Sequence, residues 1–252
     1  MAIRWTTAFW DYPAEGFESG IAFWLKVTDS ALSERRGPGG AFATLLPKAG
    51  DPCLRVQRVG EGTGGSHLDL HVDDIEVEAE RAIGLGAKVV HGEPGLVVLH
   101  SPGGFAFCLV GYHGEAAVPQ PLDWPGGQRS RVDQLCIDIP PQAFDHELAF
   151  WQTFTGWRQT TTDTREFRRL LPPPGLPLQF LLQRLDLAER GQNATAHMDL
   201  ACSDIDAETE RHVGLGAAEV RRHHWWQVMR DPGGLEYCIT RRDPDKDLHA
   251  VT

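Results

Sequence analysis

Metal-ligating side chains recur along four segments in the C-terminal half of this chain that have the pattern of β-strands. In residues 132–139, 178–183, 197–202 and 235–240, apolar side chains alternate with a second set that includes the polar residues. Successive side chains on a strand point to opposite faces of the sheet, so each segment gathers its polar residues on one face. The metal-ligating side chains on these faces are Gln134, Gln179, Gln183, His197 and Glu236. If the sheet curls, these groups converge inside it and form a site for a metal ion or a small molecule.

Imidazole nitrogen, carboxylate oxygen and amide oxygen together suit a divalent ion such as Zn, Ni, Mn, Fe or Mg. Three protein ligands from Gln134, His197 and Glu236 would leave coordination positions open for a substrate, as catalysis requires. Glu236 and Asp199 are the candidate proton-transfer groups. The alternative is that the histidine and the carboxylate only form hydrogen bonds inside a pocket.

The candidate ligands can meet only if the fold holds their strands side by side. The hydrophobic pattern predicts units in which one strand is followed by a helix and then by three strands. In the C-terminal half, strand 132–139 precedes a helix over 142–155 and strands within 166–171 and 178–185. A second unit follows with strand 197–202, a helix from an Asp204 N-cap to Gly216, and strands 219–222, 226–230 and 235–240. Helices mixed with strands and hairpins indicate the α+β class.

The N-terminal half repeats this pattern. Residues 67–87, HLDLHVDDIEVEAERAIGLGA, match residues 197–217, HMDLACSDIDAETERHVGLGA, at an offset of 130 residues. Upstream, residues 17–28 face residues 144–155 at an offset of 127. A period of this length indicates a duplicated domain and not a solenoid unit. We therefore predict domains at 1–113 and 129–252, joined by a linker at 114–128 that is rich in Pro, Gly and polar residues.

The first copy lacks most of the ligand set. His67 matches His197, but Ala106 stands in the position of Glu236, and Thr7 stands in the position of Gln134. Alanine cannot bind a metal and threonine rarely does, so a complete metal site is expected only in the second copy.

Two other features carry less weight. The run His223-His224-Trp225-Trp226 could rim a pocket and stack on a planar ligand, or it could pack in the core or at the surface. Cys108 and Cys238 match by the repeat and are interpreted as small buried side chains.

Composition excludes several classes of protein. The 252 residues carry a net charge of −11, which disfavours nucleic acid and anionic membranes as partners. There is no membrane-spanning apolar run, and the N-terminus does not have the layout of a signal peptide. Five cysteines without a CxxC spacing argue against a disulfide framework, so a cytoplasmic protein is expected.

The repeated segments HLDLHVDD, GLGA and SPGGFAFCLV, with HMDLACSD, GLGA and WQVMRDPGGLEYCIT, resemble the vicinal oxygen chelate superfamily. This superfamily includes glyoxalase I, bleomycin-resistance proteins and extradiol dioxygenases, and the resemblance covers nearly the whole chain. It implies tandem glyoxalase-like domains, each made of two βαβββ modules that form a curved sheet around a cavity. It also implies metal ligands at Gln134, at Gln179 or Gln183, at His197 and at Glu236.

The resemblance leaves two hypotheses. The first is a divalent-metal-dependent enzyme of the isomerase or lyase type, and less readily a dioxygenase, that acts on a small oxygenated molecule in the second domain. The second is a metal-free protein that binds a small molecule or sequesters an antibiotic, as bleomycin-resistance proteins do. A homodimer is possible, because the sequence does not show whether modules pair within one chain or between chains.

Overall fold

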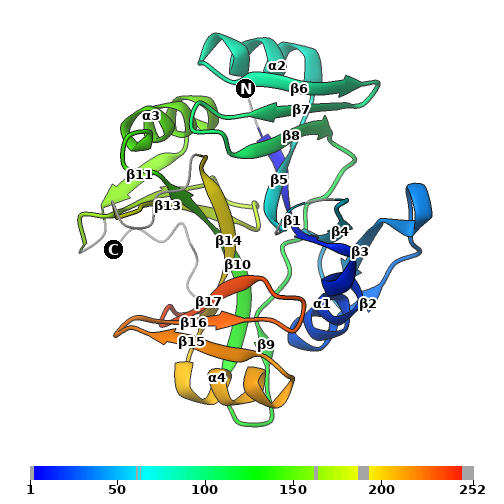
Figure 1. Ribbon diagram of the computed structural model, residues 1–252, viewed down its shortest axis with the longest axis vertical. Helices are drawn as coiled ribbons and strands as arrows, with labels where there is room; N and C mark the ends of the chain where they lie inside the picture. The colour runs from blue at the N-terminus through cyan, green and yellow to red at the C-terminus, as the bar shows by residue number, and fades with distance from the viewer. Residues whose placement is uncertain (1–2, 61, 63, 162–163, 187–192, 246–252) are drawn as a thin grey trace.

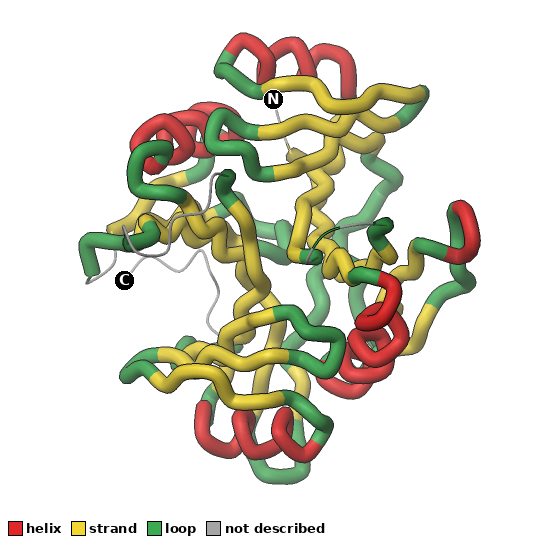
Figure 2. The backbone as a smooth tube through the Cα atoms, in the orientation of Figure 1, coloured by secondary structure: helices red, strands yellow, loops and turns green. Residues whose placement is uncertain are grey.

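A computed structural model describes residues 3–60, 62, 64–161, 164–186 and 193–245 (Figure 1). The strands of each half of the chain form one curved, open sheet (Figure 2). The first sheet has the strand order β2-β3-β4-β1-β5-β8-β7-β6. The second has the equivalent order β11-β12-β13-β10-β14-β17-β16-β15. The predicted α+β fold of two tandem domains, each with two βαβββ modules, is therefore confirmed.

The first domain consists of β1 (Ile3–Tyr12), α1 (Ala14–Val27), β2 (Ala31–Leu32), a 3-10 turn (Pro38–Gly40), β3 (Phe42–Leu46), β4 (Leu54–Arg58), β5 (Gly65–Val72), α2 (Ile75–Gly84), β6 (Lys88–Glu93), β7 (Leu96–His100) and β8 (Ala106–Gly111). The second consists of β10 (Arg129–Ile139), α3 (Phe144–Thr155), β11 (Arg158–Thr161), β12 (Phe167–Leu171), β13 (Gln179–Arg184), β14 (Thr195–Cys202), α4 (Ile205–Gly214), β15 (Ala218–Arg222), β16 (Trp226–Arg230) and β17 (Glu236–Thr240). The short strand β9 (Leu122–Asp123) pairs with β10.

The sequence analysis did not predict β2, β9 or β11. These strands are two to four residues long, which is too short for an alternating pattern to stand out. β9 lies in the segment predicted as a linker, and it pairs with the first residues of β10.

Helices α2 and α4 lie at opposite ends of the molecule, each against the last three strands of its own domain (Figure 1). The side chain of Asp204 accepts hydrogen bonds from the backbone N–H groups of Asp206 and Ala207, so the predicted N-cap is confirmed. Asp74 caps α2 in the equivalent way. These caps fix where each second-module helix begins and therefore how it sits on its sheet.

Helices α1 and α3 instead join the two domains. Trp24 of α1 packs against Tyr237 of β17, with ring centroids 4.9 Å apart. Trp151 of α3 packs against Phe107 of β8, with ring centroids 5.1 Å apart. Each first-module helix thus buries aromatic side chains on the second module of the other domain, and the buried apolar residues of both domains form one cluster.

A buried carboxylate stabilises each of these two contacts. Asp231 accepts hydrogen bonds from the Tyr12 hydroxyl and from Trp24 Nε1, the latter at 2.9 Å. At the other contact Ser101 stands in the position of Asp231, and Glu147 of α3 supplies the carboxylate. Glu147 accepts from the Ser101 hydroxyl and from Trp151 Nε1, at 2.5 and 2.8 Å. In both contacts a buried tryptophan N–H therefore donates to a carboxylate. In the first contact the carboxylate comes from the second-module strand region, and in the other it comes from the helix.

Gly20 stands in the position of Glu147 because the first contact has no room for a side chain there. A Cβ atom on Gly20 would lie 2.3 Å from the ring of Tyr12. In the first contact the ring of Tyr12 thus fills the space beside Gly20 that the side chain of Glu147 occupies in the other contact.

Within the described residues, no helix combines the length and apolar character needed to cross a membrane.

We predict that Asp231→Ala lowers the free energy of unfolding by about 3 kcal/mol, measured by urea denaturation. The reason is that the hydroxyl of Tyr12, the indole N–H of Trp24 and the backbone N–H of Leu235 lose a buried acceptor. Glu18→Ala on α1, the helix that carries Trp24, is the control, because it breaks an exposed ion pair and should cost less than about 1 kcal/mol. Equal losses for the two variants would show that Asp231 does not stabilise the domain contact.

A candidate metal and ligand site in the second domain

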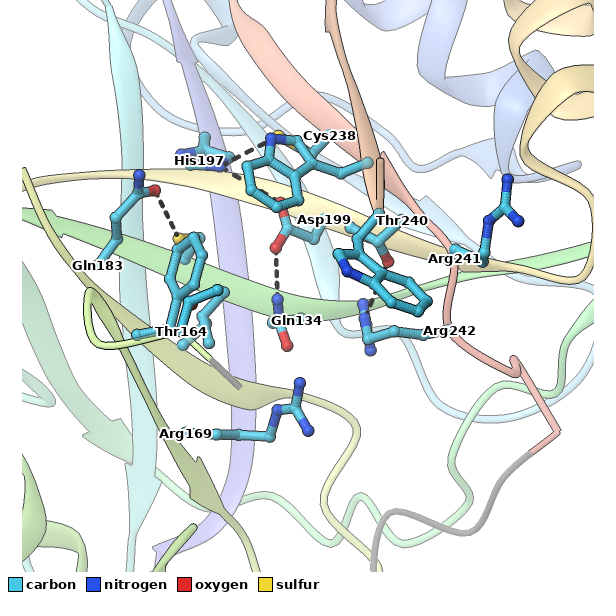
Figure 3. A pocket seen from close by; sticks show the side chains of 15 residues that line it. Gln134, Thr164, Arg169, Gln183, His197, Asp199, Cys238, Thr240, Arg241 and Arg242 are labelled. Carbon is cyan, nitrogen blue, oxygen red and sulfur yellow. Dashed lines mark hydrogen bonds and ion pairs between the residues drawn. The ribbon is translucent and has the colours of Figure 1, made fainter. Parts of the chain in front are cut away.

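A cavity of about 230 Å³ lies on the concave face of the second sheet (Figure 3). Its walls come from β10, β12, β13, β14, β16 and β17 and from the segments just before β12, before β16 and after β17. The lining residues are Gln134, Cys136, Thr164, Phe167, Arg169, Leu181, Gln183, His197, Asp199, Trp225, Trp226, Cys238, Thr240, Arg241 and Arg242. The cavity therefore combines metal-ligating groups, aromatic side chains and guanidinium groups.

The pairing of β10 with β14 sets the polar groups side by side. In this antiparallel pair Gln134 lies opposite Asp199, and Cys136 lies opposite His197. A β-bulge falls between Val132 and Gln134, immediately before the first of these pairs. Bulges commonly occur next to functional sites, where they redirect a side chain. In the first domain the corresponding bulge lies nearer the start of β1, between Ile3 and Trp5.

The imidazole of His197 lies between two carboxylates. Its Nδ1 is 2.7 Å from Oδ2 of Asp138, and its Nε2 is 3.3 Å from Oδ1 of Asp199. Burial by itself would lower the pKa of His197, but the charge of Asp138 and its hydrogen bond outweigh this and raise the pKa well above its usual value. Asp138 thus fixes the orientation of the ring and directs Nε2 into the cavity.

Two buried oxygen atoms beside this nitrogen have no hydrogen-bond partner among the described residues. They are Oε1 of Gln134 and Oδ1 of Asp199, while the amide nitrogen of Gln134 donates to the other oxygen of Asp199. Buried polar atoms are nearly always paired, so these two oxygens mark a position for an absent donor or cation. An imidazole nitrogen, a carboxylate oxygen and an amide oxygen fit a divalent cation.

The structure brings together most, but not all, of the residues that the sequence analysis selected. Gln134, His197 and Asp199 meet at the cavity wall, and Gln183 lines the cavity near Cys136, whose thiol is 3.7 Å from Oε1 of Gln183. Gln179 is buried but does not line the cavity. It occupies the first residue of β13, at the end of the strand farthest from Gln183.

The position predicted for Glu236 was wrong. Its carboxylate lies outside the cavity, with about half of the side chain exposed, and binds Arg230 at 2.6 Å. Glu236 is on the predicted face of β17, because Cys238 and Thr240 of that face line the cavity. However, β17 pairs with β14 only from Cys238 onward, so Glu236 lies beyond this pairing and directly opposite Arg230 of β16.

A thiol takes the place that the sequence analysis gave to this carboxylate. The sulfur of Cys238 is 3.5 Å from Nε2 of His197. Cys136, His197 and Asp199 also each bring one ligand atom within 4.8 Å of the others. The expected ligand set had no cysteine. The alternation along the strands nevertheless puts Cys136 on the face of Gln134 and Cys238 on the face of Glu236. The repeated cysteine at positions 108 and 238 was the signal that could have identified this group.

Sequence reasoning also missed the arginines and one of the aromatic residues that line the cavity. Arg169, Arg241 and Arg242 line the cavity, as does Phe167. Trp225 and Trp226, which had been considered both as a pocket rim and as packing residues, contribute to the lining. Arginines and tryptophans in short strands and loops have no spacing that distinguishes cavity residues from surface residues.

The first domain repeats the histidine and acid arrangement. Nδ1 of His67 is 2.7 Å from Asp11, and its Nε2 is 3.8 Å from Asp69, which matches the environment of His197. His67, Asp69 and Cys108 also bring ligand atoms within 4.8 Å of one another. The sequence repeat therefore preserved this cluster in both domains.

Bulkier neighbours surround the cluster in the first domain. Phe9, which stands in the position of Cys136, stacks on His67 with ring centroids 4.2 Å apart. Arg55, in the position of Leu181, lies 3.4 Å from Asp69 and over the ring of Phe9. A guanidinium thus forms an ion pair with Asp69, whereas among the described residues the equivalent Asp199 has an ion pair with His197 and none with an arginine.

This combination of fold and site has known counterparts. A family model described as a glyoxalase-like domain matches residues 8–110 and again residues 134–240. The chain therefore belongs to the glyoxalase-like domain family, as a tandem pair within the vicinal oxygen chelate superfamily. No curated protein matches the chain.

Solved structures share the fold at low sequence identity. A Mn(II)-bound glyoxalase from Novosphingobium aromaticivorans is 15% identical with a TM-score of 0.65, over 95% of this chain and 81% of that one. A triple mutant of 4-hydroxymandelate synthase from Streptomyces coelicolor is 14% identical with a TM-score of 0.64, over 98% and 94%. An extradiol ring-cleaving dioxygenase from B. fuscum is 11% identical with a TM-score of 0.62, over 98% and 75%. At these identities the comparison shows the shared fold.

We predict that the cavity thiols react slowly with iodoacetamide at pH 8 in the metal-free native protein. Burial raises the pKa of Cys238 to about 11 and that of Cys136 well above its usual value, so both remain neutral thiols up to that pH. Mass spectrometry of tryptic peptides measures the labelling of each cysteine. The same reaction in urea is the control, where all the cysteines should label. Rapid native labelling of Cys238 would contradict the environment described above.

Proposed function

We propose that this protein is a divalent-metal-dependent enzyme whose active site is the cavity of the second domain. The observation that supports it is a pair of buried oxygens, Oε1 of Gln134 and Oδ1 of Asp199, that have no hydrogen bond among the described residues and lie beside the ring nitrogen of His197, which is 3.3 Å from Oδ1 of Asp199. The reaction class that we propose is a lyase or isomerase acting on a small oxygenated molecule. Glyoxalase-like relatives include a Mn(II)-bound enzyme, which is consistent with this proposal.

The chain's own residues have distinct roles in this proposal. Asp138 accepts the Nδ1 proton of His197, which leaves Nε2 to face the ligand. The Gln134 amide N–H donates to one oxygen of Asp199 and so leaves the other oxygen directed at the cavity. Asp199 can then hold a metal ion or accept a proton from the substrate. Glu236, the other candidate base, lies outside the cavity and has no role in this mechanism.

A divalent ion bound to these groups would polarise adjacent substrate oxygens and stabilise an enolate or a similar oxyanion. The surrounding thiols and aromatic rings give part of the cavity wall a weakly polar surface, which strengthens electrostatic interactions beside it.

A dioxygenase reaction is less well supported. Non-haem iron oxygenases typically use two histidines and one carboxylate. Within the described residues, the cavity contains one histidine, His197, and Gln134 occupies the position where a second would be expected. The structural likeness to extradiol dioxygenases therefore supports a common scaffold more than a common reaction.

The second candidate is a metal-free small-molecule binding protein, such as one that sequesters an antibiotic. The raised pKa of His197 favours it, because a protonated imidazole between Asp138 and Asp199 is stable without a metal ion. The two candidates differ in a single measurable property, which is the affinity of the cavity for a divalent cation.

Metal analysis of protein purified without a His tag tests the proposal. We expect about one divalent ion per chain after reconstitution with Mn, Fe, Ni or Zn, and a loss of at least tenfold in affinity for Asp199→Asn. Isothermal titration with the metal salt gives the affinity, and elemental analysis identifies the ion that copurifies.

Two matched variants locate the ion. Glu236→Gln should retain the metal, because its carboxylate binds Arg230 outside the cavity. His67→Gln, at the equivalent position of the first domain, should also retain it, because Arg55 and Phe9 surround that cluster. The absence of metal binding by the native protein, even after reconstitution, would leave the metal-free binding protein as the function.

A further inference from the structure

Arg169 carries a guanidinium that is half-buried in the cavity and has no hydrogen-bond or ion-pair partner among the described residues. It comes from β12, and its Nε atom is fully buried and unpaired. In Figure 3 its guanidinium points across the cavity toward the side chain of Gln134. Burial lowers the pKa of Arg169 and nearby Arg242 lowers it further, which outweighs the opposite effect of the carboxylates of Asp133 and Asp199. A buried cation without a partner is costly, so its retention indicates an absent anion.

The charge of the cavity supports the same conclusion. The chain has a net charge of −11, yet the cavity is lined by three arginines and one carboxylate. Asp133 neutralises Arg242 through two hydrogen bonds, of 2.8 and 2.6 Å. Arg169 and the exposed Arg241 remain without a side-chain partner within the described part of the chain, and both line the cavity. A negative ligand group would therefore find an attractive potential here despite the acidic surface.

Planar side chains form another part of the wall. Trp226 stacks on His223 with ring centroids 4.3 Å apart and meets the ring of Phe167 edge-on at 5.7 Å. Trp225 is half exposed at the same cavity. These rings suit the face of a planar ligand. A cavity of about 230 Å³ accommodates one aromatic ring with a small substituent, since an engineered protein cavity of roughly 150 Å³ holds benzene.

We propose that the ligand of this cavity is a small planar carboxylate, and that Arg169 anchors its carboxylate group. The proposal rests on the proposed function of the same cavity and adds the chemical class of the substrate. A guanidinium is well suited to this role because its fork of N–H donors matches the two oxygens of a carboxylate.

The first domain is an internal comparison for this assignment. Strand pairing aligns Arg169 with Leu181 and, in the first domain, Thr44 with Arg55. Thr44 therefore occupies the position of Arg169, and its hydroxyl accepts a hydrogen bond from Arg36 at 2.9 Å. Among the described residues, Arg169 thus lacks a partner at the cavity of the second domain, whereas the equivalent Thr44 of the first domain has a hydrogen-bond partner.

Isothermal titration of benzoate into EDTA-treated protein tests the proposal, with benzamide as the neutral analogue of the same shape. We expect native protein to bind benzoate at least tenfold more tightly than benzamide, and Arg169→Gln to abolish this preference. Arg169→Lys should retain part of the preference, because it keeps the charge but loses the fork geometry.

Arg168→Gln is the matched control. Arg168 is the adjacent residue on β12, does not line the cavity, and donates to the backbone carbonyls of Arg165 and Phe167. This variant should bind benzoate as native protein does. Equal binding of benzoate and benzamide by native protein, or equal effects of the two glutamine variants, would overturn the proposal.

Stability measurements separate a ligand-binding role from a structural one. Because Arg169 has no hydrogen-bond or ion-pair partner in the described part of the chain, Arg169→Gln should unfold at the same or a higher urea concentration than native protein. A lower midpoint would mean that Arg169 stabilises the fold, which would overturn its assignment as a ligand anchor.

The metal-free condition separates this proposal from the proposed function. Benzoate binding that depends on Arg169 in a protein that binds no metal would support the substrate class and refute the metal-dependent enzyme. Metal binding by a protein that shows no preference for benzoate over benzamide would support the metal-dependent enzyme and refute the substrate class.

Discussion

The register between β10 and β14 is the constraint on which the site depends. It sets Gln134 opposite Asp199 and Cys136 opposite His197, and it brings Asp138 within hydrogen-bond distance of the His197 ring. Because side chains alternate along a strand, a slip of one residue would turn either row of these groups into the apolar layer. The apolar rows on the other face, which contribute to the buried core, therefore hold the polar rows in place.

The same register occurs in the first domain, where Phe9 and Arg55 pack around the cluster of His67. Phe9 covers one side of the ring, and Arg55 supplies a positive charge to Asp69. The two domains are nevertheless dependent on each other, because each first-module helix packs on the second module of the other domain. Tyr237, one residue before Cys238 of the cavity, packs against Trp24 of the first domain. The first domain thus supports the strand that completes the cavity of the second.

The second cavity contains a carboxylate and a guanidinium that each keep a buried atom without a hydrogen bond among the described residues. The described interior contains buried carboxylates such as Asp231, Glu147 and Glu208, and each accepts hydrogen bonds from neighbouring side chains. In the cavity, by contrast, Oδ1 of Asp199 and Nε of Arg169 have no hydrogen bond among the described residues, at a cost in stability. Proteins tolerate such costs mainly at functional sites, and the positions of these atoms define the ligand chemistry that we propose.

The sequence by itself determined the duplication, the α+β order of elements and the face of each strand that carries polar groups. These features follow from local periodicity and from the repeat, so Gln134, His197 and Asp199 were identified as neighbours. Only the tertiary structure decided which residues along each face lie deep enough to meet. It placed Cys238 beside His197 in place of Glu236, left Gln179 outside the cavity, added Arg169, and decided that both tryptophans line the cavity. The physical reason is that alternation fixes the direction of a side chain, whereas the curvature and stagger of neighbouring strands fix its depth.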